Sequence, residues 1–103
     1  LIGRTAVGFA SRANTVIGVV TTNAKLNKEE INKVAQMAQD GLARTIRPAH
    51  TMFDGDTLFA LATGDKPADV NIVGAFAAEV FAQAVVRGVR AAKSAGGLPG
   101  LGL

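Results

Sequence analysis

Along the chain, short apolar runs typical of strands alternate with longer segments whose apolar residues recur at helical spacing. The run at 15–22 is short and rich in β-branched residues, which predicts a strand buried on both faces. A second, mostly apolar run at 57–63 also predicts a strand. Segments 28–46 and 70–93 repeat apolar residues at helical spacing, and a weaker run at 6–10 predicts an edge strand or an extended arm. The order is therefore β-α-β-α, an α/β (α+β) fold class.

The ends of the first helix are marked clearly. Asn27 is a favourable N-cap, and Glu30 three residues later completes a capping box. Leu26 and Ile31 are spaced to form a hydrophobic staple across this turn. Pro48 ends the helix, because proline cannot continue the hydrogen-bond ladder.

The second helix begins after Asp69, a candidate cap, and Gly96-Gly97 is the expected stop. Its polar residues form one narrow stripe, and the rest of its circumference is apolar: Glu79, Gln83, Arg87, Arg90, Ser94. Such a helix must be covered on nearly all sides. A chain of this size cannot supply that cover, so we expect another segment or subunit. The charged stripe argues against a membrane span.

The composition bounds the class of protein. A chain of 103 residues with 49% apolar content is a single domain or a fragment, with 15–95 as its core and 1–14 as a preceding segment or edge strand. It begins at Leu1 without a methionine, which suggests a fragment or a processed chain. The absence of cysteine excludes disulfides and fits a cytoplasmic location. The net charge of +3 is scattered, so we expect no nucleic-acid partner.

Thr15 is the first candidate for chemistry. It opens the β-branched run, directly after Asn14. The simplest interpretation is an ordinary strand-opening threonine. The alternative is a reactive hydroxyl, since a packed strand holds its first residue rigidly.

The loop before the second strand concentrates polar groups. Asp54-Gly55-Asp56 is a strong turn signal, and the same residues also place two carboxylates beside the predicted Thr15 strand, where they could shuttle a proton. The lone His50 is expected to be a loop residue hydrogen-bonded to backbone. A metal site made from these residues has too few ligands to be favoured, and we expect no metal and no cofactor. No pattern places a serine beside His50 to form a triad.

Three segments carry a resemblance to a known family: N-T-V-I-G-V-V-T-T-N-A at 14–24, D-G-L-A-R-T at 40–45 and H-T-M-F-D-G-D-T-L-F-A-L-A-T-G at 50–64. In this order they resemble the C-terminal part of the L-aminopeptidase/D-esterase family, self-processing β-aminopeptidases related in fold to ornithine acetyltransferase. The resemblance covers nearly all of 14–93 and identifies 1–13 poorly.

The resemblance implies a catalytic role for Thr15. Family precursors are cut just before a Ser or Thr, which becomes the N-terminal nucleophile of the smaller subunit. The cut here would lie between Asn14 and Thr15. The freed α-amine, with a reference pKa of about 7.7–8.0, would serve as the hydroxyl's base. Asp56 matches the family's acidic residue, whereas Asp54 stands where well-studied members have Ser, with a one-residue insertion before it.

The resemblance also implies partners and an overall architecture. The expected fold is an αββα sandwich with mixed sheets, and the expected oxyanion-hole groups lie in a larger N-terminal subunit of the same precursor. We expect a homo-oligomer that hydrolyses small peptides or N-terminal amino-acid amides, without nucleic-acid or membrane partners. Two alternatives remain open: a non-catalytic fragment or assembly module, and an acyl transferase like ornithine acetyltransferase.

Overall fold

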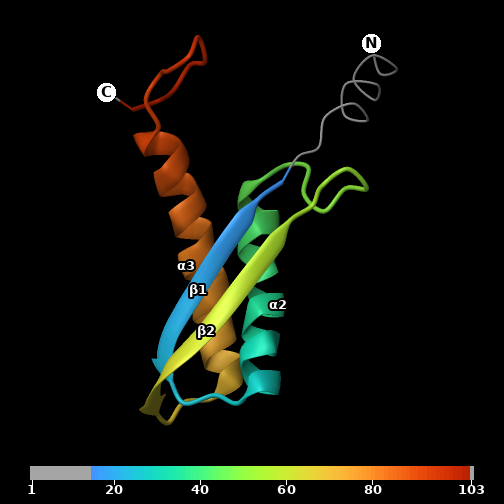
Figure 1. Cartoon of the computed structure of the whole chain (residues 1–103), viewed down its shortest axis with the longest axis vertical. Coiled ribbons are helices and arrows are strands. Elements are labelled where there is room, and N and C mark those ends of the chain that lie inside the picture. The colour runs from blue at the N-terminus through green and yellow to red at the C-terminus, as the bar shows by residue number, and fades with distance from the viewer. Residues whose placement is uncertain (1–14, 103) are drawn as a thin grey trace.

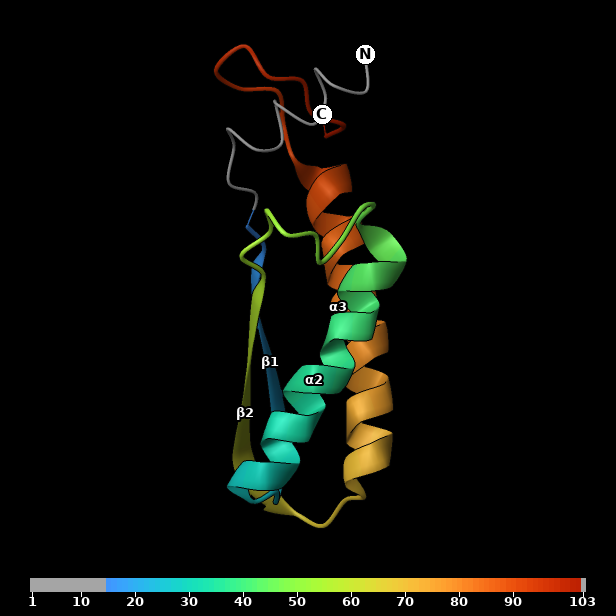
Figure 2. The same cartoon turned by 90° about the vertical axis from the view of Figure 1, so that its right-hand side faces the viewer.

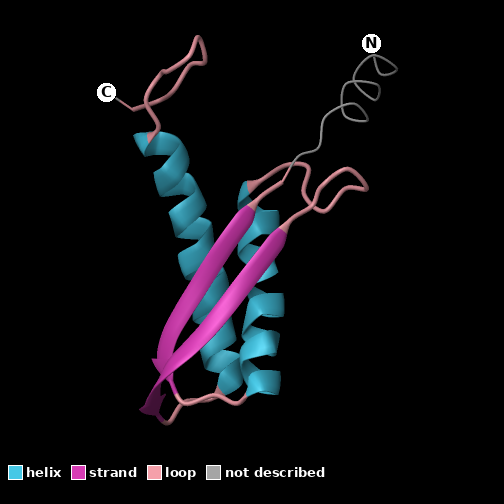
Figure 3. Cartoon of the chain, in the orientation of Figure 1, coloured by secondary structure: helices cyan, strands magenta, loops and turns pink. Residues whose placement is uncertain are grey.

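The computed structural model describes residues 15–102 of the chain, which form two strands and two helices. They follow in the order β1 (Ile17–Ala24), α2 (Lys28–Thr45), β2 (Thr57–Lys66) and α3 (Val70–Ala91). Figures 1 and 3 show the two strands side by side with the helices behind them. The α/β class expected from the sequence is confirmed. The predicted edge strand at 6–10 lies outside the described residues.

The strands are parallel, and their register pairs Ile17 with Thr57 and Thr22 with Ala62. An irregularity follows Thr22, after which Ala24 pairs with Lys66. Both helices lie on one face of this sheet (Figure 2), and α2 makes the crossover that two parallel strands need. The described residues contain this one parallel pair, so the mixed sheets and second layer of an αββα sandwich stay predictions.

The core forms where the two helices meet each other and the sheet. Val34, Ala38 and Ala77 are its buried centre, and Leu42 is fully buried beside them. Gly41 brings the helices close together, since a Cβ there would overlap the backbone carbonyl of Ala78. Small residues thus set the helix spacing, as the alanine- and glycine-rich composition suggests.

Gly18 has a packing role in β1. A Cβ built on it would overlap the ring of Phe81 on α3 and would lie 2.9 Å from Leu58 Cδ2. Because Gly18 has no side chain, the ring of Phe81 can pack directly against β1 at this position, and Phe81 is only 7% exposed.

The helix caps agree with the sequence. The Asn27 side chain accepts from Glu30 N at 2.8 Å, and Glu30 Oε1 accepts from Asn27 N at 3.0 Å, which completes the predicted capping box. The Asp69 side chain accepts from Asn71 N at 2.7 Å and caps α3. Both helices begin where predicted and end one or two residues earlier than expected.

Two predicted breaks are wrong. Gly64 does not end the second strand, which continues to Lys66 because Gly64 lets the backbone of Asn23 approach closely. Gly96 and Gly97 do not stop α3, which ends at Ala91. With φ of 57° and 79°, they form the two-residue turn of a small hairpin in which Ala95 and Leu98 exchange hydrogen bonds of 3.0 and 2.9 Å. The tail after α3 thus contains a short regular turn.

The prediction that the first strand is buried on both faces is wrong for this chain. Side chains of β1 alternate between exposed and partly buried, and Ile17 and Val19 are 72% and 58% exposed. Phe59 and Leu61 continue the same uncovered face on β2, at 58% and 51%. The helices cover the other face of the sheet. β1 is therefore apolar on both faces, but the described residues bury only one of them.

Helix α3 also has an uncovered apolar side. Phe76 is 66% exposed and Val80 is 57% exposed, whereas Ala77, Ala78 and Phe81 face the core. The helix is long and apolar enough to cross a membrane by length and composition alone, and 22% of its most apolar window is buried. This exposed side of α3 is where the additional segment or subunit expected from the sequence would pack.

Candidate active site

Thr15 lies two residues before β1, at the end of the sheet nearest the 46–56 loop (Figure 1), so the strand predicted at 15–22 begins two residues later than expected. Its side chain is exposed. Its hydroxyl faces Gly55 in the predicted turn, since a Cβ built on Gly55 would lie 3.2 Å from Thr15 Oγ1. The two strands are parallel, so both begin at this end, and this topology brings Thr15 to the aspartate turn.

Asp56 ties the turn to the first strand. Its Oδ1 accepts a hydrogen bond of 3.0 Å from the backbone N–H of Val16, forty residues away along the chain. The N–H of Thr57 in turn donates to the carbonyl of Val16 at 2.9 Å. The Asp56 side chain is 7% exposed. A nearly buried carboxylate is therefore fixed one residue from the threonine hydroxyl.

Asp54 has a different setting from Asp56. Its Oδ2 accepts from both the N–H and the hydroxyl of Thr51, each at 2.9 Å. The N–H of Asp54 donates to the carbonyl of Thr51 at 3.1 Å. These three bonds close the loop on itself, which is the turn role that the sequence favours for this residue.

Within residues 15–102, His50 contacts the carboxylate of Asp56 and makes no hydrogen bond to backbone of the kind expected from the sequence. Its Nδ1 lies 3.6 Å from Asp56 Oδ2, which is an ion-pair distance and too long for a hydrogen bond. Its side chain is 44% exposed. No residue pattern predicts this contact, because it depends on the conformation of the loop between Thr45 and Asp56.

The structure thus brings three polar side chains to one end of the sheet: Thr15, Asp56 and His50. Asp54 lies in the same turn and is engaged with Thr51, and Asn14 lies outside the described residues. Within residues 15–102, His, Asp and Glu side chains form no group of three that could hold a metal ion. The groups present suit proton transfer and nucleophilic attack on an acyl carbon.

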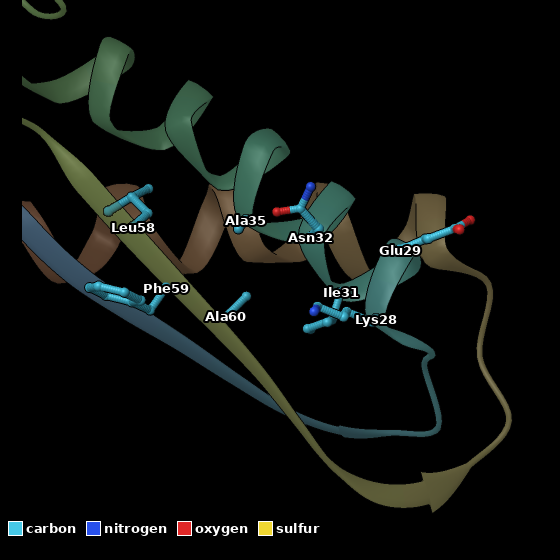
Figure 4. A pocket seen from close by; sticks show the side chains of 8 residues that line it. All are labelled: Lys28, Glu29, Ile31, Asn32, Ala35, Leu58, Phe59 and Ala60. Atoms are coloured by element: carbon cyan, nitrogen blue, oxygen red, sulfur yellow. The ribbon is translucent and has the colours of Figure 1, made fainter.

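Two hollows lie along the sheet. One, of about 400 Å³, runs beside β1 from Val16 to Thr21 and is bounded by Val80, Phe81 and Val85 of α3. A larger one, of about 520 Å³, lies between α2 and β2 and includes none of the candidate site residues (Figure 4). Its walls combine Lys28 and Glu29 with Ile31 and Leu58. Of these two hollows, both lined by described residues, the first begins one residue from Thr15 and lies next to the candidate site.

Comparison with known proteins assigns the chain to a family. Residues 2–101 match the family described as peptidase family S58. The chain belongs to this family, and the resemblance to the L-aminopeptidase/D-esterase family is confirmed.

Curated relatives agree with this assignment. A Mycobacterium leprae protein named as an uncharacterized aminopeptidase is 50% identical over 86% of this chain and 29% of its own length. A Mycobacterium tuberculosis aminopeptidase, also uncharacterized, is 45% identical over 88% of this chain and 31% of its own. A 6-aminohexanoate-oligomer endohydrolase of Kocuria sp. is 32% identical over 75% of this chain and 25% of its own. The chain therefore spans less than a third of the length of these relatives.

Proposed function

We propose that this chain is the nucleophile-bearing part of an autoprocessing amidase of the aminopeptidase type, with Thr15 as the nucleophile. One observation carries the proposal. The exposed Thr15 hydroxyl faces Gly55, and the neighbouring Asp56 carboxylate holds the N–H of Val16 at 3.0 Å. An exposed hydroxyl just before a strand, next to a residue whose backbone a carboxylate anchors, suits acyl chemistry.

The maturation step follows from these groups. Thr15 Oγ1 attacks the carbonyl carbon of Asn14, the C–N bond to Thr15 breaks, and the hydroxyl proton passes to the leaving nitrogen. Water then hydrolyses the resulting ester, which leaves a carboxylate on Asn14 and a free amine and hydroxyl on Thr15. The amine serves as the base for the hydroxyl in later turnovers.

The mature site would act on the amide bond at the amino end of a small peptide or amino-acid amide. Thr15 attacks the substrate carbonyl, the amine product leaves with the proton, and water releases the acyl group. Asp56 holds the strand start in place through Val16, and Asp54 orders the loop through Thr51. The relatives named as 6-aminohexanoate-oligomer endohydrolases support amide hydrolysis as the reaction class and suggest unbranched amino-acid oligomers as a second substrate to test.

The larger part of the precursor is proposed to complete the site and cover the apolar surfaces. The uncovered sheet face contains Ile17, Val19 and Phe59, at 72%, 58% and 58% exposure. Covering them would remove substantial apolar area from water, at about 25 cal/mol per Å². A homo-oligomer is proposed to cover the exposed side of α3, and the assembled enzyme is proposed to be cytoplasmic.

The test is the intact mass of the purified full-length protein. We expect two fragments whose masses place the cut between Asn14 and Thr15, and a single unbroken chain for Thr15→Ala. Thr15→Ser keeps a hydroxyl and should still be cut. An unbroken wild-type chain would favour an assembly module, and acetyl transfer to ornithine without amine release from amino-acid p-nitroanilides would favour an acyl transferase.

A further inference from the structure

His50 stands in an unusual backbone conformation next to the candidate site. Its φ is 58°, and among residues 15–102 it is the one non-glycine residue with positive φ. This left-handed conformation is unfavourable for a residue with a Cβ. Such a residue persists only where the surrounding structure holds it, and such positions cluster at functional sites. The side chain that this backbone presents is therefore worth explaining.

The imidazole is directed at one particular oxygen. Nδ1 lies 3.6 Å from Asp56 Oδ2, while the other oxygen, Oδ1, accepts the Val16 N–H at 3.0 Å. A carboxylate turns freely about its last torsion unless both oxygens are engaged. Here one oxygen is held by the strand and the other faces the histidine.

We propose that His50 is a positioning residue that keeps the Asp56 carboxylate on the backbone N–H of Val16, the residue after Thr15. The inference rests on the proposed function and deepens it, since it assigns a role to a residue that the proposed reaction does not itself use. With His50 in place, Oδ1 stays on the backbone of Val16, and the start of β1 keeps the Thr15 hydroxyl against Gly55. His50 acts through Asp56 and takes no part in the covalent steps.

A purely structural role for His50 makes a different prediction. If the residue only shapes the loop, glycine should replace it without loss, because glycine adopts positive φ freely. If the imidazole matters, glycine relaxes the backbone and still removes the group that faces Asp56. His50→Gly therefore separates the side chain from the backbone conformation.

A second pair of variants tests the same idea without depending on glycine. Asparagine and aspartate both tolerate the left-handed region and have the same shape. His50→Asn offers an amide N–H as many bonds from the backbone as Nδ1, whereas His50→Asp sets a second carboxylate against Asp56. At the position of His50 Nδ1, the asparagine variant has a neutral hydrogen-bond donor and the aspartate variant has a negatively charged acceptor.

The experiment measures the self-cleavage rate of the full-length protein by intact mass, together with kcat and KM for a p-nitroanilide and the thermal midpoint. We expect His50→Gly and His50→Asp to be slower by about tenfold or more, through kcat, because a misplaced group costs rate without lost binding. We expect His50→Asn to stay within about threefold of wild type. The midpoint of His50→Gly should not fall.

Three results would overturn the proposal: wild-type rates in His50→Gly, equal rates in the asparagine and aspartate variants, or a loss confined to KM. The wild type and Thr15→Ala keep the two hypotheses distinct. If the wild type is cut and Thr15→Ala is not, the proposed function stands whatever His50 does. If the wild type is not cut before Thr15, the proposed function fails and the role of His50 fails with it.

Discussion

The backbone N–H of Val16 donates a hydrogen bond of 3.0 Å to Oδ1 of Asp56. This bond joins the residue immediately before β1 to the residue immediately before β2, and Thr57 N donates to the carbonyl of the same Val16. The residue immediately before Val16 is the candidate nucleophile. The backbone that follows Thr15 is therefore held by a carboxylate that lies forty residues from Val16 in the sequence.

Removing that carboxylate should affect both stability and self-cleavage. Asp56→Ala leaves the partly buried Val16 N–H without its acceptor, which costs about 1–3 kcal/mol in the free energy of unfolding. Asp56→Asn keeps an oxygen for the N–H, so it should unfold close to wild type while cleaving more slowly. Chemical denaturation and intact mass measure the two effects. Cleavage of Asp56→Ala at the wild-type rate would contradict the role given to this carboxylate.

Gly55 should be sensitive to a single added methyl group. A Cβ there would lie 3.2 Å from Thr15 Oγ1, which is tighter than ordinary van der Waals contact, so Gly55→Ala should displace the hydroxyl. Gly55 has no positive φ, so alanine introduces no backbone strain and stability should change by less than about 1 kcal/mol. We expect cleavage to slow by about tenfold or more.

The control for Gly55→Ala is Gly88→Ala. A Cβ on Gly88 meets nothing within 4 Å, and alanine is favoured in a helix, so this variant should cleave normally and gain slight stability. Equal cleavage by the two alanine variants would show that the Thr15 hydroxyl does not depend on the open space at Gly55.

Local signals in the sequence predicted the helices well. The capping box of Asn27 and Glu30 and the cap at Asp69 are properties of neighbouring residues, so they are visible without the fold. The glycines were harder to interpret. Gly64 allows a close approach of Asn23, and Gly18 allows one of Phe81. Both partners are distant in the sequence, so neither the longer strand nor the ring contact could be predicted from the local pattern.

The candidate site was predictable in part for a similar reason. The resemblance proposed Thr15, Asp54 and Asp56 as candidate site residues, and the parallel strands bring Thr15 to the turn. The contact of His50 with Asp56 depends on the loop conformation and on a φ of 58°, which no composition or spacing encodes. The burial of β1 on one face also escaped prediction, because an apolar run does not say which chain covers its second face.

Asp54 provides a prediction that separates loop order from proton transfer. Its Oδ2 accepts two bonds from Thr51, so Asp54→Ala should lose about 1 kcal/mol of stability and slow cleavage, and Asp54→Asn should retain most of both. Thermal unfolding and intact mass are the measurements. A fully stable Asp54→Asn that no longer cleaves would give Asp54 a charge-dependent role in the chemistry.

The contact between Gly18 and Phe81 should dominate the packing of β1 on α3. Gly18→Ala places a methyl group inside the Phe81 ring and should cost about 1–3 kcal/mol in the free energy of unfolding. Adding Phe81→Leu to Gly18→Ala should restore part of that loss, because the smaller side chain leaves room for the methyl group. Chemical denaturation of the two single variants and the double variant measures the coupling, and strictly additive losses would contradict it.

The uncovered sheet face supports a last prediction about assembly. Val19 is 58% exposed on the sheet face that the helices leave uncovered, in register with Phe59 of β2, so Val19→Lys leaves the buried core between sheet and helices unchanged. If the larger part of the precursor covers this face, the lysine would bury an unpaired charge there, which is strongly unfavourable. We expect the two parts of the full-length Val19→Lys protein to stop co-purifying after cleavage.

The control is Gln36→Lys, which adds the same charge at an exposed polar position of α2 and should assemble normally. Equal assembly of the two variants would mean that this face of the sheet stays open to solvent.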